Sequence, residues 1–443
     1  VPPVSGWYSN PFTNCMGSPI RSEIWAMIAP GQPHLAAYYA YQDAVTDHAG
    51  GEGVYGEMFF AAVESAAFTT SDPHELLEIG LSVIPPDCRT ARAASDTVRW
   101  HAEGLDWGET RNRIIEKHGH VNFTDAPQNI AFTVLGLLYG QDFGDAICKA
   151  VNCGYDTDCT GATLGAILGI ILGVDGLPAK WKEPVGDMIV VSPPVKGFPA
   201  PKTVLELTER TARVAAEVAA FQAHRPVPEP ASLWSIRPNE NRFYYPDSFS
   251  PSLEAIVSYD SKGPVAFPGT DSPLKITLIN HSSERWYGAL HFHLPSGWSG
   301  GEPQSYSLAP GAQQELSVTL HAGGELQPDH LVEMEITRLH NDARWQSIRQ
   351  PLLFAQAMRW QVETPEAVTK KILCPTNKIP FDKTCSLGTY RLSSDLICPS
   401  AREARLMVAT ACPVRVWLNE RLVFDHWQAG SGIPAYHRGQ GAP

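Results

Sequence analysis

Residues 150–173 read Ala-Val-Asn-Cys-Gly-Tyr-Asp-Thr-Asp-Cys-Thr-Gly-Ala-Thr-Leu-Gly-Ala-Ile-Leu-Gly-Ile-Ile-Leu-Gly, and this stretch decides the fold. Its first part is a glycine turn that carries two carboxylates, Asp156 and Asp158. Its second part is an apolar helix with glycine at every fourth position, namely 161, 165, 169 and 173. Residues four apart share one face of a helix, so these glycines predict a groove against which another backbone lies closely.

The two carboxylates stand where this helix begins, and its unpaired N–H groups favour negative charge there. Aspartates two positions apart in a turn can direct their oxygens to one point, and Mg²⁺ takes oxygen ligands. The alternative is an aspartate N-cap with a spare surface carboxylate. The glycine turn and the apolar helix favour the metal site, because carboxylates buried between them need a partner.

Residues 152–166, Asn-Cys-Gly-Tyr-Asp-Thr-Asp-Cys-Thr-Gly-Ala-Thr-Leu-Gly-Ala, resemble the C-terminal metal motif of the ADP-ribosylglycohydrolase family. The resemblance implies an all-α enzyme with two Mg²⁺ ions that cleaves ADP-ribose from protein side chains or related ribosyl conjugates. It also implies that Asp156 and Asp158 bind metal, and that Gly154 and Tyr155 lie beside the substrate.

The chain departs from this motif at one position. The family usually has threonine after the second aspartate, as a metal ligand, whereas this chain has Cys159. A thiol is a poor ligand for Mg²⁺. Either Thr160 is the ligand instead, or the second metal position is altered or empty.

Two segments near the start of the chain also resemble the family. Residues 14–21 and 29–31 resemble the loop that approaches the ribose and the phosphates, which implies that Arg21 binds substrate. The alternative is an arginine that only tethers the loop. His48 matches a histidine at the end of a family helix, although histidine is also a common helix C-terminal cap.

The helical pattern continues through the first half of the chain without alternating strands. We expect an irregular loop over residues 1–34, and then helices at 33–49, 53–68, 74–83, 87–103, 107–118, 126–139, 143–152, 160–173 and 203–222. Pro127 near the start of one helix and Gly140 after its end fit the usual asymmetry of helix termini. The pattern predicts an all-α bundle over residues 1–224.

Composition changes after a proline-rich spacer. Alternating prolines at 226, 228 and 230 predict an extended linker over 225–249. Residues 250–356 show short alternating runs that predict an immunoglobulin-like β-sandwich, similar to accessory domains of bacterial glycoside hydrolases. His291 and His293 share a strand face there, as surface residues or as half of a metal site.

Residues 357–443 form the last predicted unit. Residues 412–425 alternate around a hairpin turn and resemble a strand pair of galactose-binding-like jelly rolls. That fold needs about eight strands, so the unit appears as a partial jelly roll. The β units make glycans candidate partners.

The net charge of the chain limits the classes of partner that it is expected to bind. Net charge is −13 and the pI is near 5.6, which argues against nucleic acid and against anionic membranes. The longest apolar run, 161–174, is too short to span a bilayer. The cysteines form no Cys-x-x-Cys pair, which disfavours zinc-ribbon and thioredoxin-like interpretations.

The family's N-terminal motif supplies a glutamate and an Asp-Asp cluster that complete its two-metal site. The 443 residues contain no Asp-Asp pair, and the resemblance covers roughly residues 7–220. We therefore expect a fragment truncated at both ends, or a divergent member without catalysis. The acid/base glutamate would belong to the absent segment.

These observations predict a metal-dependent glycohydrolase acting on a small-molecule or protein-linked glycosyl substrate. One alternative is a glycosidase for a non-nucleotide sugar. The other is a non-catalytic protein that binds ADP-ribose or glycans.

Overall fold

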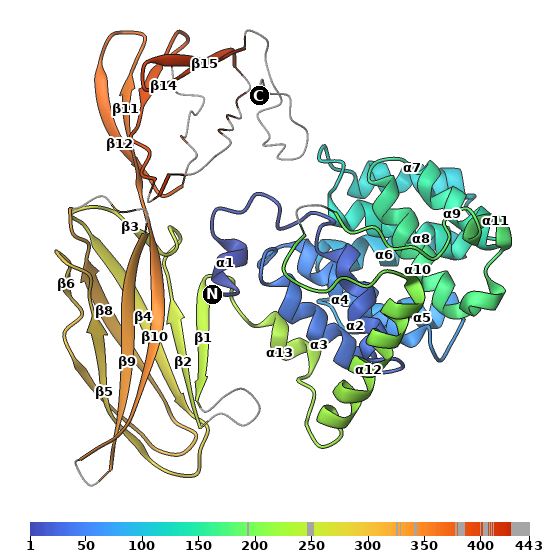
Figure 1. Cartoon of the computed structure of the whole chain (residues 1–443), viewed down its shortest axis with the longest axis horizontal. Helices are drawn as coiled ribbons and strands as arrows, with labels where there is room; N and C mark the ends of the chain where they lie inside the picture. Colours follow the sequence, from blue (N-terminus) through green and yellow to red (C-terminus); the bar gives the residue numbers. More distant parts are fainter. Residues whose placement is uncertain are drawn as a thin grey trace. The chain divides into compact units, whose positions relative to one another are not determined.

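The computed structural model describes residues 1–192, 195–245, 252–324, 329–340, 343–376, 386–398 and 412–426, with the single positions 327, 379, 400, 401, 406, 408 and 410. The chain divides into two compact units, Val1–Ser394 and Asp395–Pro443. The first unit holds a helical domain, a β-sandwich and a small sheet, and the second holds a hairpin (Figure 1).

The first half of the chain is helical, as predicted. Its elements are α1 (Val4–Trp7), η1 (Pro19–Arg21), α2 (Ser22–Ile28), α3 (Pro33–Ala44), α4 (Glu52–Ala66), α5 (Pro73–Ser82), α6 (Arg89–Ala102), α7 (Trp107–His118), α8 (Ala126–Tyr139), α9 (Phe143–Asn152), α10 (Thr157–Gly176), α11 (Ala179–Lys182), α12 (Val204–Gln222) and α13 (Pro230–Trp234).

Helices α4 and α8 form the centre of the domain. Nearly every residue of both is buried, including Phe59 and Phe60 of α4 and Ile130 of α8. Both sequences are mostly apolar and rich in small residues, which is the pattern of a helix enclosed by others. The outer helices begin at aspartate caps, with Asp72 capping α5 and Asp106 forming a capping box on α7.

The structure corrects the prediction for the first 34 residues. They are not an irregular loop, because α1, η1 and α2 lie within them. Helix α2 buries Ala26 and Ile28 and packs against α4, so its burial depends on a segment outside its own sequence. Helix α3 ends at Ala44, and His48 follows it in a turn rather than ending the helix.

The predicted close approach of a backbone to the glycine face of α10 is also wrong. A Cβ on Gly161 or Gly165 would meet side chains of α9, at 3.0 Å and 3.7 Å, and one on Gly169 or Gly173 would meet nothing within 4 Å. Gly173 has a left-handed φ of 66° and kinks the helix. The groove therefore lies mostly open, and its glycines do not hold a backbone contact.

Helix α10 is also longer than the apolar run predicted. It spans 20 residues, and it is the one helix in the described residues long and apolar enough to cross a membrane. The apolar run 161–174 forms the middle of this helix, and Gly173 kinks it near its end. Length and composition alone carry no conclusion about a membrane, because core helices pass the same test.

Two five-stranded sheets form the sandwich. One has the order β1-β2-β4-β8-β6 and the other β3-β10-β9-β5-β7, with antiparallel pairing except between β10 and β3. The strands are β1 (Glu240–Tyr245), β2 (Leu253–Ser258), β3 (Val265–Ala266), β4 (Asp271–Asn280), β5 (Trp286–His293), β6 (Ser299–Gly300), β7 (Gln304–Leu308), β8 (Gln313–His321), β9 (Asp329–His340) and β10 (Ala343–Gln356). Alternate residues of both sheets form one apolar core, as in β4, where burial follows every second position.

The predicted linker over 225–249 is wrong for its described part. Helix α13 begins there at Pro230, which suits the first turn of a helix, and β1 pairs with β2 along its whole length. Phe243 and Tyr245 of β1 are buried in the sandwich core. Residues 246–249 of this segment lie outside the described residues.

The last predicted unit falls into two parts. Strands β11 (Met358–Glu363), β12 (Thr369–Cys374) and β13 (Arg391–Ser393) form a three-stranded sheet in the first compact unit. Strands β14 (Val414–Leu418) and β15 (Arg421–His426) form the predicted hairpin in the second. Asn419 and Glu420 both have positive φ at its turn.

Candidate metal centre

The turn between α9 and α10 fixes the position of the carboxylates. Gly154 and Tyr155 take left-handed φ values of 82° and 66°, which reverses the chain into α10. The backbone N–H of Asp156 donates to Oδ1 of Asn129 on α8, at 3.1 Å. The fully buried Asn129 amide donates in turn to the carbonyls of Phe123 and Asp125, at 2.9 Å each. The turn is therefore held by a side chain of the central helix.

The ligand atoms of Asp156, Asp158 and Cys159 all lie within 4.8 Å of one another. Asp156 is buried, with 5% of its surface exposed, whereas Cys159 is half-buried and Asp158 is exposed. Asp156 does not cap the helix with its own carboxylate. Two carboxylates and a thiol around one point are a donor set that fits a divalent cation.

Burial and mutual repulsion act on this cluster. Burial raises the pKa of Asp156, and the charge of Asp158 raises it further. Burial also raises the pKa of the Cys159 thiol, and the neighbouring carboxylates add to that shift. Both shifts favour the protonated, uncharged forms, which is the response expected of crowded acids without a cation.

Thr160 follows Cys159 in the first turn of α10. Its Oγ1 donates to the carbonyl of Thr157, at 3.1 Å, and the residue is fully buried in α10. Cys159 lies beside the carboxylates, although a thiol is a poor ligand for Mg²⁺. The assignment of Thr160 as a ligand stays a prediction.

Gly154 and Tyr155, the two turn residues predicted to lie beside the substrate, are at the surface of the turn. Tyr155 is 37% exposed, and its ring contacts Phe132 with centroids 5.7 Å apart. A Cβ on Gly154 would meet only a guanidinium nitrogen of Arg111, at 3.9 Å. The turn thus offers an open backbone next to the carboxylates.

Arg21 and His48 lie together in a separate network. Arg21 bonds Asp43 at 2.6 Å and Asp47 at 2.9 Å, and Nδ1 of His48 lies 2.7 Å from Asp47. Burial lowers the pKa of His48, while hydrogen bonds from Arg21 and His48 outweigh burial and lower the pKa of Asp47. In the described part of the chain, no hydrogen bond or ion pair joins Arg21 or His48 to the metal cluster.

Sequence reasoning missed an inner group of acids, Glu23, Glu57 and Glu64. Glu57 accepts from Ser18 and from Nε1 of Trp25, and burial raises its pKa to about 9. Neither carboxylate oxygen of Glu64 has a hydrogen-bond partner among the described residues, and burial raises its pKa well above the usual range.

One of the inner acids lies beside the Arg21 network. Glu23 is half-buried, and burial raises its pKa. Glu57 lies 3.6 Å from Arg21. A signal for these acids was present in the sequence, because Glu57 and Glu64 are seven residues apart on one face of an otherwise apolar helix.

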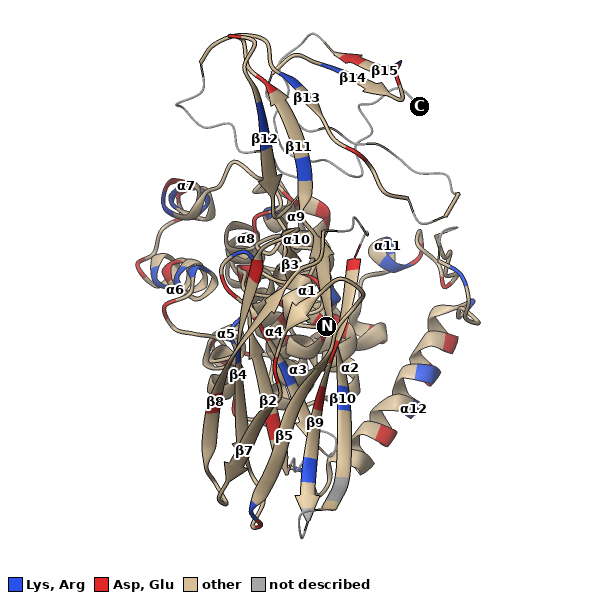
Figure 2. Ribbon diagram, turned by 90° about the vertical axis from the view of Figure 1, so that its left-hand side faces the viewer, with Lys and Arg blue, Asp and Glu red and all other residues tan. Residues whose placement is uncertain are grey.

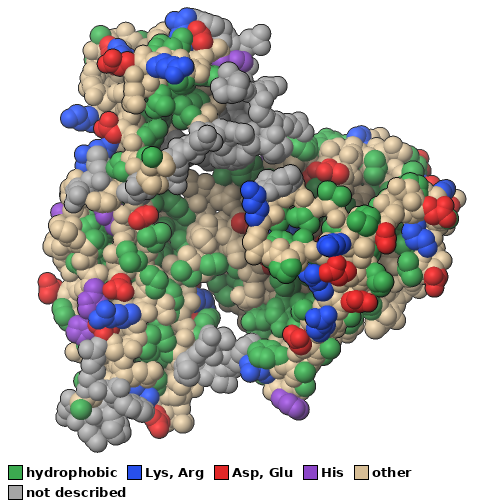
Figure 3. Space-filling view, in the orientation of Figure 1, with side chains coloured by type: hydrophobic (Ala, Val, Ile, Leu, Met, Phe, Trp, Pro, Cys, Tyr) green, Lys and Arg blue, Asp and Glu red, His purple; other side chains and the backbone are tan. Residues whose placement is uncertain are grey.

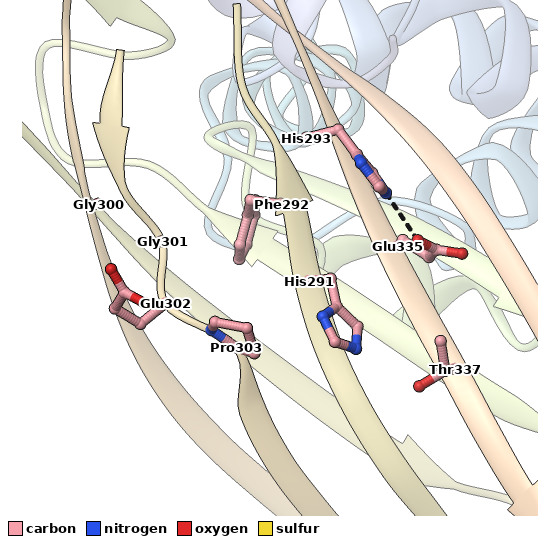
Figure 4. Close-up of a pocket in the computed structure, with 9 residues that line it drawn as sticks. All are labelled: His291, Phe292, His293, Gly300, Gly301, Glu302, Pro303, Glu335 and Thr337. Carbon is pink, nitrogen blue, oxygen red and sulfur yellow. Dashed lines mark hydrogen bonds and ion pairs between the residues drawn. The ribbon is translucent and has the colours of Figure 1, made fainter. Parts of the chain in front are cut away.

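A second feature lies on the sandwich. His291 and His293 of β5 line a hollow of about 430 Å³ with Glu302, and with Glu335 of β9 (Figure 4). Nε2 of His293 lies 2.6 Å from the buried Glu335 carboxylate. His293 is thus paired with a carboxylate.

The surface of the helical domain is mixed in character. Acidic and basic side chains are interspersed on α6, α7 and α12 (Figure 2). Apolar side chains also reach the surface of the domain (Figure 3), and exposed ones on α10 and α12 include Leu172, Val174, Val204 and Leu205.

The fold and the turn define the class: an all-α domain with an acidic cluster at the start of an apolar helix. The family model described as ADP-ribosylglycohydrolase matches residues 4–220. This helical domain therefore belongs to the ADP-ribosylglycohydrolase family, and the membership supports a glycohydrolase-type function.

Comparisons with curated proteins and with solved structures add no argument about function. No curated protein matches the chain. Among 21 matching chains of solved structures is one titled "Pseudomonas fluorescens alkylpurine DNA glycosylase AlkC bound to DNA containing an abasic site analog". It is 12% identical, with 77% of this chain and 99% of that chain covered and a TM-score of 0.14. A likeness of this degree carries no argument.

Proposed function

We propose that the protein is a metal-dependent glycohydrolase that cleaves an ADP-ribosyl or related ribosyl bond. The observation that carries the proposal is the convergence of Asp156, Asp158 and Cys159 within 4.8 Å, in a domain of this family. Mg²⁺ is the cation that the resemblance implies, with two ions in a complete site.

Each part of the turn has a role in this proposal. Asp156 and Asp158 hold the cation, and the buried Asn129 keeps the backbone of Asp156 in place. A divalent cation supplies a charge that orients sugar hydroxyls and a water molecule at the anomeric carbon. Gly154 and Tyr155 lie beside the sugar, where the open backbone permits close approach.

Charge develops at the anomeric carbon as the glycosidic bond breaks, and nearby carboxylates stabilise such an oxocarbenium-like centre. Asp158 is exposed and adjacent to the turn, so it can serve this purpose as well as hold the cation. Arg21 is the candidate for a phosphate contact, although its pairing with Asp43 and Asp47 also fits a tether for the loop.

The experiment measures ADP-ribose released from mono-ADP-ribosylated peptides by the full chain, before and after EDTA and after cation is restored. We expect activity that EDTA abolishes and that Asp156→Asn and Asp158→Asn each lower by at least about 100-fold, as for ligands that hold a catalytic ion. The exposed Asp175→Asn on the same helix is the matched control. Calorimetric binding of ADP-ribose without turnover would instead support the non-catalytic alternative.

A role for the sandwich in glycan binding is proposed from the hollow at His291 and His293. The test is a glycan array with the full chain and with a Glu302→Gln, His291→Ala double variant. Signal that disappears in the variant and that EDTA leaves unchanged supports this role. A signal that the variant leaves unchanged contradicts it.

A further inference from the structure

We propose that the thiolate of Cys159 is a ligand of the bound cation, so that the site prefers a thiophilic divalent cation such as Co²⁺, Zn²⁺ or Cd²⁺ over Mg²⁺. The inference rests on the cation site of the proposed function and specifies its chemistry. It resolves the alternatives that the sequence left open at Cys159 and Thr160.

The distances allow Asp156, Asp158 and Cys159 to bind one ion together. Carboxylate oxygens bind such ions at about 2.0–2.2 Å and thiolates at about 2.3 Å, so two ligands of one ion lie at most about 4.5 Å apart. The ligand atoms of Asp156, Asp158 and Cys159 lie within 4.8 Å of one another. Small rotations of the exposed Asp158 and half-buried Cys159 side chains would bring the ligand atoms within that limit.

Thr160 is the other residue that could supply the third donor. Thr160 is fully buried, and its hydroxyl donates to a carbonyl of its own helix. Cys159 is half-buried beside the carboxylates. Position 159 therefore supplies the third donor, and that donor is sulfur rather than oxygen.

The helical domain also holds a buried acid outside the cluster. Glu64 is fully buried, and among the described residues neither of its oxygens has a partner. Buried acceptors without donors are rare in folded proteins and call for an ion or ordered water.

The donor set decides which ion binds best. Soft thiolates select metals such as zinc, whereas Mg²⁺ requires oxygen ligands in octahedral geometry and sheds its waters reluctantly. When the cation binds, the Cys159 S–H bond breaks, sulfur keeps the electron pair and binds the metal, and the proton passes to solvent. A cation that cannot accept sulfur gains only the two carboxylates.

The test titrates the full chain with Co²⁺ and records the near-ultraviolet absorption of sulfur-to-cobalt charge transfer. We expect a band that saturates at one equivalent, that Zn²⁺ and Cd²⁺ displace, and that excess Mg²⁺ leaves in place. Cys159→Ser should remove the band and weaken Cd²⁺ binding by at least about tenfold. Cys148→Ser is the matched control, because Cys148 is an exposed thiol on α9, and it should leave the band unchanged.

Cys159→Thr provides a second variant that restores an oxygen donor, and circular dichroism checks that both variants fold. A Co²⁺ complex without the band, a band that survives Cys159→Ser, or displacement of Co²⁺ by equimolar Mg²⁺ overturns the inference. These outcomes are independent of turnover. Metal-dependent hydrolysis without the band leaves the proposed function standing, and the band without hydrolysis leaves only the thiolate ligand standing.

Discussion

Asn129 is the residue through which the centre of the domain positions the candidate site. It is fully buried, accepts from the backbone of Asp156 and donates to two carbonyls of the preceding loop. Few other side chains could satisfy both sets of partners, because a side-chain amide combines a carbonyl acceptor with two N–H donors.

Asn129→Ala tests this role. The variant leaves the N–H of Asp156 and two carbonyls without their partner, so we expect the free energy of unfolding to fall by about 1–3 kcal/mol. Cation affinity should fall with it, because the turn loses its support. Urea unfolding and calorimetric cation titration measure the two effects, with the exposed Asn152→Ala next to the turn as control. Unchanged affinity in a folded Asn129→Ala protein would contradict the role.

Glu57 makes the stability of the domain depend on pH. Burial raises its pKa to about 9, so the folded protein keeps this proton at pH values where the unfolded chain has lost it. Native protein then binds more protons than unfolded protein between about pH 4.5 and pH 9, and stability falls as pH rises through that range.

Glu57→Gln removes this titration while keeping an uncharged side chain that can still bond Ser18 and Trp25. We expect the decline in the free energy of unfolding between pH 5 and pH 8.5 to become shallower, by up to about 1.4 kcal/mol per pH unit. Urea unfolding followed by helical circular dichroism at several pH values measures the slope. Parallel slopes for the two proteins would show that Glu57 does not carry the dependence.

At the scale of the element, α10 joins an ordered start to a loosely packed end. Its first turn carries the acidic cluster. A Cβ added to Gly161 would lie 3.0 Å from a side chain of α9. Its later glycines have open space around them. The regular spacing of glycine along the helix therefore has different consequences at its two ends.

Gly169→Ala and Gly173→Ala form a matched pair that tests this description. Gly169 lies in the helix with open space around it, so alanine there should stabilise the domain by about 0.5–1 kcal/mol. Gly173 has a φ of 66°, so alanine there should destabilise it by about 1–2 kcal/mol. Thermal unfolding of both variants decides the matter, since a stabilising Gly173→Ala would mean that the kink is absent in solution.

At the scale of the whole molecule, the helical domain and the sandwich have separate principal cores. The largest cluster of buried side chains draws on the helices, and another draws mainly on the two sheets. The candidate cation ligands all come from the helical domain. A cation that binds there stabilises directly only the part of the chain that presents its ligands.

Thermal unfolding with and without saturating cation tests this separation. At a free cation concentration 100 times its dissociation constant, the helical domain should gain about 2.7 kcal/mol. The helical signal at the transition should therefore shift to higher temperature than the strand signal does, and Asp156→Asn should remove the shift. Equal shifts of both signals would show that the two parts unfold as one.

Much of the fold followed from local patterns. Helices α3 to α10 and α12, the sandwich over residues 250–356 and the hairpin at β14 and β15 were predicted, because apolar periodicity and turn residues act over a few positions. Helix α2 and strand β1 were missed, since each is buried mainly by contact with a distant segment. Pro230 shows the same limit, because proline suits both an extended spacer and the first turn of a helix.

The site was predictable only in part. The two aspartates of the turn were found from spacing and resemblance, whereas Glu57 and Glu64 were not singled out. Their importance comes from burial, and burial of α4 results from the packing of its neighbours around it.

The sequence by itself determined the all-α class, the family, the acidic turn and the sandwich, because each depends on residues close together in the chain. Only the tertiary structure decided that Cys159 lies beside the carboxylates, and that Asn129 anchors the turn. It also decided that most of the glycine face stays open. The reason is physical: side-chain direction, burial and the pairing of buried polar groups depend on segments that meet only when the chain has folded.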